Sequence, residues 1–117
     1  MTAMKHSTAF VFSLVLTAAA LAWACALPAT AQTAGADLAK ANGCMTCHDI
    51  AKKLVGPGFA QVAAKYKADA AAPAQLVSRI RGGSSGTWGR ISMPPNTQVS
   101  ERDAQALVQW ILSLPAS

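Results

Sequence analysis

The chain has 117 residues, with ten Lys and Arg against five Asp and Glu, and only 13% of its side chains are charged. The first 31 residues hold one of those charges, so the other 86 carry nine basic and five acidic side chains, a net charge of +4. A basic domain of this length is too short for a Rossmann unit with a substrate domain, or for a TIM barrel. A core of this size is also only marginally stable. We therefore expect something besides side chains to fill part of the core.

The N-terminal segment has the pattern of a secretory leader. Lys5 precedes an apolar run over residues 9–27, and the small residues 29–31 match an A-x-A cleavage site. We predict a cleaved signal peptide over residues 1–31. The mature domain, residues 32–117, is then exported from the cytoplasm.

Two alternatives to cleavage remain open. The apolar run approaches the roughly 20 residues that span a bilayer, so it could be an uncleaved anchor. Cys25 could be lipidated, although the bulky Trp23 nearby fits that poorly. Once the leader is removed, the cysteines that remain are Cys44 and Cys47, too few for a disulfide framework.

Apolar residues of the mature chain recur at helical spacing, and no segment alternates with the period of two that indicates a strand. Pro73 in a first turn and Gly82 at the end delimit one of the four helices we predict. Ser100 and Asp103 resemble a capping box at the start of the last helix, which Pro115 ends. The four apolar faces consist of Ala34, Leu38 and Ala41; Phe59, Val62, Ala63 and Tyr66; Leu76, Val77 and Ile80; and Ala104, Leu107, Val108 and Ile111. The sequence therefore predicts an all-α domain.

Residues 44–48 form a C-x-x-C-H motif, which is the attachment signature of a c-type haem. On a helical turn, the thiols of Cys44 and Cys47 share one face, so both can form thioethers with one porphyrin edge while His48 binds the iron. The alternatives are a thioredoxin-like redox pair and half of a zinc site. The first requires a βαβ pattern and the second two more ligands, and the mature chain, with a single histidine, offers neither.

A Gly-, Ser-, Pro- and Asn-rich segment spans residues 82–99, and loops of this length in compact domains are usually functional or disordered. It contains Met93, which we expect to be the sixth iron ligand. The mature chain has two methionines, and Met45 lies inside the attachment motif, where its sulfur cannot reach the opposite face of the ring. Met93 precedes two prolines that restrict the backbone. Packing in the loop is the alternative role for Met93. His/Met ligation fills both axial positions and favours electron exchange.

Six short motifs follow one another along the mature chain: Gly43-Cys44-x-x-Cys47-His48, Val55-Gly56-Pro57, Val62-Ala63-x-Lys65-Tyr66, Gly86-x-Trp88-Gly89, Met93-Pro94-Pro95 and Gln109-Trp110-Ile111-Leu112-Ser113. In order and spacing they resemble the small bacterial class I cytochromes c of the c-551/c-552 type. The resemblance covers essentially the whole mature chain. It implies the class I cytochrome c fold, with about four short helices wrapped around one covalently attached haem c.

The resemblance also implies supporting roles around the haem. In the family, the carbonyl at the position of Pro57 accepts a hydrogen bond from the proximal imidazole, and the position of Asn96 hydrogen-bonds the ligand sulfur. The positions of Trp88 and Arg79 contact a haem propionate. The alternatives are a core aromatic for Trp88, a solvated helix face for Arg79 and a turn residue for Asn96.

Other residues are expected to have structural or docking roles. We predict a close contact between Gly43 and Trp110 of the last helix. Four lysines are expected to ring the thioether edge and to attract acidic partner proteins: Lys40, Lys52, Lys53 and Lys65. Solubility is the alternative role for each of these lysines. No basic cluster is interleaved with aromatics, so nucleic-acid binding is not expected.

The function implied is that of a monomeric, monohaem electron carrier of the periplasm, and not of an enzyme. Its redox partners would include a nitrite reductase, a cytochrome oxidase, a bc1-type complex or a photosynthetic reaction centre. One alternative is a membrane-tethered haem c subunit of a larger redox enzyme, if the leader is retained. Another is a ligand-binding or peroxidase-like haem protein, which requires Met93 to be absent from the iron.

Overall fold

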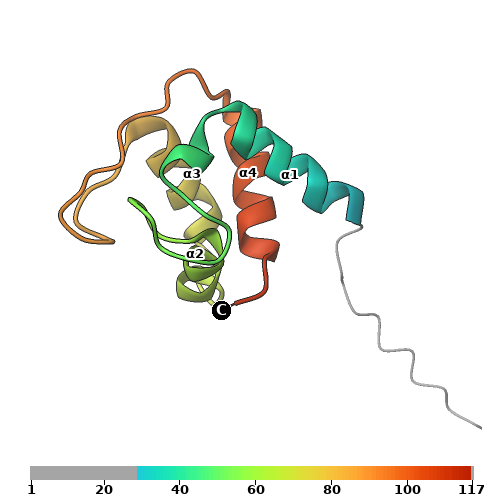
Figure 1. The fold of residues 1–117 in the computed structure, drawn as a ribbon, viewed down its shortest axis with the longest axis horizontal. Coiled ribbons are helices and arrows are strands. Elements are labelled where there is room, and N and C mark those ends of the chain that lie inside the picture. Colours follow the sequence, from blue (N-terminus) through green and yellow to red (C-terminus); the bar gives the residue numbers. More distant parts are fainter. Residues whose placement is uncertain (1–28, 117) are drawn as a thin grey trace, which may run out of the picture.

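The structure, a computed structural model, describes residues 29–116, which contain four α-helices and one short 3-10 turn (Figure 1). The elements in chain order are α1 (Ala29–Ala41), η1 (Cys44–Thr46), α2 (Phe59–Tyr66), α3 (Ala72–Gly82) and α4 (Glu101–Ser113). Between residues 29 and 116, pairing of β type is limited to a single antiparallel bridge, Ser84 with Met93. The predicted all-α class is confirmed.

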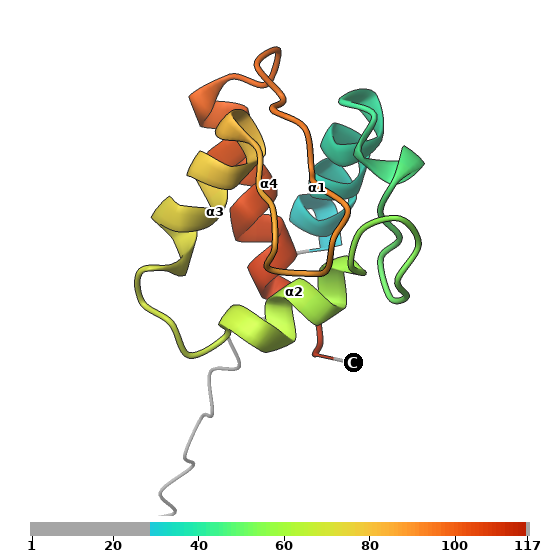
Figure 2. The ribbon, with the colours of Figure 1, turned by 90° about the vertical axis from the view of Figure 1, so that its left-hand side faces the viewer.

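The C-terminal helix α4 is the centre of the fold. It contacts each of the other three helices and lies between α1 and α3 in both ribbon views (Figures 1 and 2). Leu107 and Val108 on this helix are each only 1% exposed. Because three helices pack on one, the core is a single cluster to which α1, α2, α3 and the end of the long loop all contribute.

The predicted boundaries of α2, α3 and α4 agree with the structure. All four residues of the apolar face predicted for α2 are buried. Pro73 lies in the first turn of α3, and Gly83, at φ 83°, ends that helix in a conformation that glycine adopts without strain. At the start of α4, the Ser100 hydroxyl accepts a hydrogen bond from the backbone N–H of Asp103.

The predicted buried face of α1 is correct for Leu38, which is half-buried against the core, and wrong for the two alanines. Ala34 and Ala41 are exposed, whereas Gly35 and Ala39 are buried. The reason is the side chain of Trp110, because a Cβ atom added at Gly35 would lie 2.1 Å from its Cγ. Small residues surround this helix on several sides, so their spacing alone could not select the side that meets α4.

The close contact predicted between Gly43 and Trp110 is also wrong, since Gly35 makes that contact. A Cβ atom added at Gly43 would have no neighbour within 4 Å, and its φ of 73° identifies it as a turn residue between α1 and η1. Glycine is required here by backbone conformation and not by packing.

The predicted leader lies mostly outside the described residues. Its last three residues, 29–31, form the first turn of α1, so cleavage after Ala31 would leave a helix that starts near Gln32. Over residues 29–116, none of the helices is both long and apolar enough to span a membrane.

Candidate functional site

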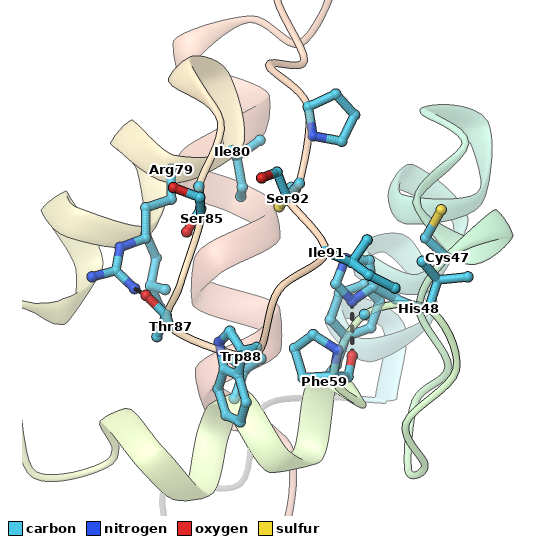
Figure 3. Close-up of a pocket in the computed structure, with 18 of the residues that line it drawn as sticks. Cys47, His48, Phe59, Arg79, Ile80, Ser85, Thr87, Trp88, Ile91 and Ser92 are labelled. Carbon is cyan, nitrogen blue, oxygen red and sulfur yellow. Dashed lines mark hydrogen bonds between the residues drawn. The ribbon is translucent and has the colours of Figure 1, made fainter.

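A pocket opens between α2, α3, α4 and the two long loops, and it collects most of the site residues predicted from the sequence (Figure 3). Six of the eight line it: Cys47, His48, Pro57, Arg79, Trp88 and Met93. Cys44 and Asn96 are not among its lining residues. Its floor is apolar and includes Leu76, Val108 and Ile111.

The C-x-x-C-H motif forms a tight turn directly after α1. The carbonyl oxygen of Cys44 accepts hydrogen bonds from the backbone N–H of Cys47 (3.2 Å) and of His48 (3.0 Å). Both cysteines of the motif are partly buried. Cys44 packs against the core, and its burial raises the pKa of the Cys44 thiol. The turn brings Cys47 and His48 to the rim of the pocket.

The His48 ring is held from two sides. Its Nδ1 lies 2.8 Å from the carbonyl oxygen of Pro57, which can only accept, so Nδ1 carries a proton and, in the neutral imidazole, Nε2 has the lone pair. The ring stacks on Phe59 with centroids 5.0 Å apart and an interplanar angle of 13°. A Cβ atom added at Gly56 would lie 2.5 Å from the imidazole Cε1. The imidazole is therefore positioned by one hydrogen bond, one aromatic contact and one glycine.

The loop that carries Pro57 is fastened at both ends. Gly56 donates to the Cys47 carbonyl (2.8 Å), and Phe59, at the start of α2, donates to the Asp49 carbonyl (2.9 Å). The Asp49 carboxylate accepts from the backbone N–H of Ala51 (2.8 Å) and of Lys52 (3.0 Å). These two hydrogen bonds hold the pKa of the Asp49 carboxyl below its usual value, and the bond from the Lys52 N–H has the larger effect.

Met93 reaches the pocket from the loop between α3 and α4. Its N–H donates to the Ser84 carbonyl (2.8 Å), and its own carbonyl accepts from the Ser84 N–H (3.0 Å). A Cβ atom at Gly83 would be 3.0 Å from the Met93 carbonyl oxygen, so the two arms of the loop approach closely. Met93 therefore lines the pocket from a loop, held by these backbone hydrogen bonds and not by a helix or strand.

Asn96 fastens the end of this loop to α3. Its side-chain amide donates to the carbonyls of Ile80 (3.2 Å) and Pro94 (3.1 Å), and its backbone N–H also donates to Ile80 (3.0 Å). Its role here is to hold the backbone beside Met93.

The wall of the pocket near Trp88 carries the positive charge of Arg79. Arg79 donates through Nη1 to the hydroxyl of Tyr66 (2.6 Å) and to that of Thr87 (3.2 Å; Figure 3). The ammonium of Lys65 lies 5.6 Å from the centre of the Trp88 ring. Lys65 therefore lies beside the indole of Trp88, outside the set of residues that line the pocket. Tyr66 and Thr87 were not predicted as site residues, because no sequence spacing links a helix-face tyrosine to an arginine on another helix.

The donor set fits a haem. One free imidazole nitrogen and one thioether line an apolar pocket, two thiols lie on the turn beside it, and a guanidinium lies on its wall. A thioredoxin-like or zinc site has less support from the geometry. Between residues 29 and 116, no three His, Cys, Asp or Glu side chains come close enough together to hold a metal ion.

The family model described as Cytochrome c matches residues 32–115, essentially the whole described region. The chain belongs to the cytochrome c family. It is 53% identical to cytochrome c-552 of Nitrosomonas europaea over 81 residues, which cover 69% of this chain and 79% of the relative. It is 51% identical to cytochrome c-551 of Pseudomonas aeruginosa over 76 residues, which cover 65% and 72% of the two chains.

The crystal structure of wild-type Nitrosomonas europaea cytochrome c552 matches with a TM-score of 0.66 and 53% sequence identity. The match covers 68% of this chain and 98% of that one. The predicted class I cytochrome c fold is confirmed, and with it the cofactor, since the family binds one covalently attached haem c. The protein is thus a small electron-transfer haem protein.

Proposed function

We propose that this protein is a periplasmic single-electron carrier, and not an enzyme, in which Cys44 and Cys47 attach the haem and His48 and Met93 bind its iron. One observation carries the proposal. His48 and Met93 line the same pocket, and the hydrogen bond from His48 Nδ1 to Pro57 leaves Nε2 free to bind a metal. A hydrogen bond from the nitrogen that does not bind the metal fixes the ring and raises the basicity of the ligand nitrogen.

The bound haem supplies a one-electron iron couple, and the protein controls its surroundings. The stack on Phe59 and the close approach of Gly56 oppose rotation of the His48 ring. The bridge to Ser84 holds the backbone of Met93. An apolar floor keeps water away from the iron. Because little would have to move or change its solvation, one-electron transfer would be fast, and with His48 and Met93 both bound to the iron no position would be left for a substrate.

Two further residues on the wall are proposed to contact a haem propionate. Trp88 has an indole N–H and Arg79 a guanidinium, and both line the pocket. A buried carboxylate needs such donors. For Asn96 we propose a hydrogen bond to the Met93 sulfur, which requires its amide to turn away from the Pro94 carbonyl.

Electrons are proposed to leave through the pocket mouth. Within residues 29–116, the large apolar side chains that are 44% to 69% exposed all belong to the two loops that flank this mouth: Ile50, Leu54, Val55 and Ile91. Val55 and Ile91 line the pocket itself, and the exposed Lys52 and Lys53 lie in the same loop as Val55. Apolar area with basic charges beside it suits brief docking on an acidic partner protein. Lys40 lies in the last turn of α1, two residues before the turn that leads to Cys44.

The partner classes proposed are nitrite reductase, cytochrome oxidase, a bc1-type complex and a photosynthetic reaction centre. The proposed location in the periplasm rests on the leader pattern of residues 1–31, and the proposed carrier is a monomer. The mass of the protein isolated from cells tests this point. A chain that begins at Gln32 and carries one haem supports the proposal, whereas a retained leader in the membrane fraction shows the tethered subunit instead.

Extraction with acidified acetone tests the attachment. Haem held by thioethers stays with the protein, and a Cys44→Ala, Cys47→Ala double variant should lose it. Met45→Leu, a substitution inside the same turn, is the matched control and should keep it. Pigment that is extracted from the wild type would overturn the proposal.

A further inference from the structure

The positive charge of Arg79 is held in the pocket wall by neutral groups. Among the pocket-lining residues, which all fall between 29 and 116, there is no Asp or Glu, and the single guanidinium or ammonium group is that of Arg79. The two acceptors of its Nη1 are the uncharged hydroxyls of Tyr66 and Thr87. No carboxylate of the pocket lining therefore offsets the guanidinium charge, which stays available to the haem propionate proposed above.

Tyr66 is the more rigid of the two acceptors. Its ring is 7% exposed and belongs to the core, so its hydroxyl is a fixed point at the end of α2. The guanidinium carbon also lies 5.7 Å from the centre of the same ring, within the range of a cation–π contact. Thr87, in contrast, lies in the loop after α3. The hydroxyl and the ring of Tyr66 thus both restrain the guanidinium group.

We propose that Tyr66 is a positioning residue for the redox centre, which fixes the Arg79 guanidinium at the pocket wall and thereby raises the reduction potential of the haem. The inference rests on the proposed function. A positive charge fixed beside a poorly solvated site disfavours the oxidised iron, which carries one more positive charge than the reduced iron. A guanidinium without its anchor turns toward water, where solvent and salt screen it.

Tyr66→Phe tests the inference, because it removes one oxygen atom and keeps the ring. The expected result is a lower reduction potential than in the wild type. Arg79→Met should also lower the potential, and adding Tyr66→Phe in that background should produce no further fall, since the hydroxyl then has no charge to position. An unchanged potential in Tyr66→Phe would overturn the inference. The inference would also be overturned if Tyr66→Phe lowered the potential by the same amount in the Arg79→Met background as in the wild type. That result would show that Tyr66 acts independently of Arg79.

Ser113→Ala is the control for loss of a partly buried hydroxyl, since the Ser113 hydroxyl donates to the Trp110 carbonyl at 2.6 Å on the C-terminal turn of α4. Its potential should equal that of the wild type. If Tyr66→Phe does not fold, Arg79→Lys replaces it, because lysine keeps the charge but lacks the planar fork that reaches two hydroxyls. It too should lower the potential, and an unchanged value would count against the inference.

Proton exchange at the Arg79 guanidinium gives a second readout that does not depend on the potential. In NMR spectra of the reduced protein, exchange with water should be faster in Tyr66→Phe than in Ser113→Ala, and equal rates would contradict the inference. Failure of the proposed function has a different signature. A wild type that lacks covalent haem or an iron-bound thioether would disprove that function, whereas an intact haem spectrum with an unmoved potential in Tyr66→Phe disproves only the role of Tyr66.

Discussion

Met93 and Ser84 exchange two backbone hydrogen bonds, of 2.8 and 3.0 Å, across the loop between α3 and α4. Such a pair is the smallest unit of an antiparallel ladder. It holds the Met93 backbone in a segment that has no helix or strand of its own. The pocket therefore receives a thioether from a loop whose shape is set by this pair and by the bonds of Asn96 to α3.

Loss of the Met93 thioether should expose the iron. In Met93→Ala, we expect the sixth position to open to carbon monoxide in the reduced state. The potential should fall by on the order of 0.1 V, a part of the roughly 0.8 V range that axial ligands span. Optical titration with carbon monoxide and potentiometry measure the two effects. Met45→Leu should behave like the wild type, and a Met93→Ala potential equal to that of the wild type would rule out Met93 as a ligand.

A methyl group at Gly56 should displace the His48 ring, because the added Cβ would lie 2.5 Å from Cε1. We expect Gly56→Ala to reduce the free energy of unfolding by about 1–3 kcal/mol, the usual cost of overpacking. Denaturant unfolding of the haem form measures this. In Gly82→Ala, the new Cβ would have no neighbour within 4 Å, so its stability should stay close to that of the wild type. Equal stabilities of the two variants would show that His48 is not confined as described.

Removal of the α4 cap should weaken the helix on which the other three pack. Ser100→Ala deletes the hydroxyl that accepts from the Asp103 N–H at 3.0 Å, and we expect a loss of about 1 kcal/mol. Thermal unfolding measures the change. Ser78→Ala removes an exposed hydroxyl from the middle of α3, where it caps no helix end, and should have little effect. If both substitutions had the same small effect, the cap would contribute nothing measurable.

Reversal of charge beside the pocket mouth should slow electron transfer. The Lys52→Glu, Lys53→Glu double variant should react with an acidic partner protein about tenfold more slowly at low salt, at the lower end of the range for electrostatic steering. The difference should shrink as ionic strength rises. Stopped-flow kinetics over a salt series measures it, with the exposed Arg102→Glu on α4 as the control. Rates that respond to neither charge nor salt would disprove this docking surface.

The sequence predicted the helices and the haem motif because each depends on local pattern. Three apolar faces and the Ser100 cap follow from spacing along one helix, and the two thiols and the imidazole are adjacent in the chain. The face of α1 could not be predicted, since it depends on Trp110, a residue distant in sequence that contacts Gly35. The hydrogen bond from Arg79 to the Tyr66 hydroxyl could not be predicted either, because it forms only when the two helices that carry these residues have packed together.

The optical spectrum of the oxidised wild-type protein tests the central claim most directly. Iron bound by His48 and Met93 should show the weak sulfur-to-iron charge-transfer band at the red end of the spectrum, and the band should vanish in Met93→Ala and persist in Met45→Leu. A purified wild-type protein that has haem but lacks this band would contradict the ligand assignment, and a colourless protein would contradict the whole account.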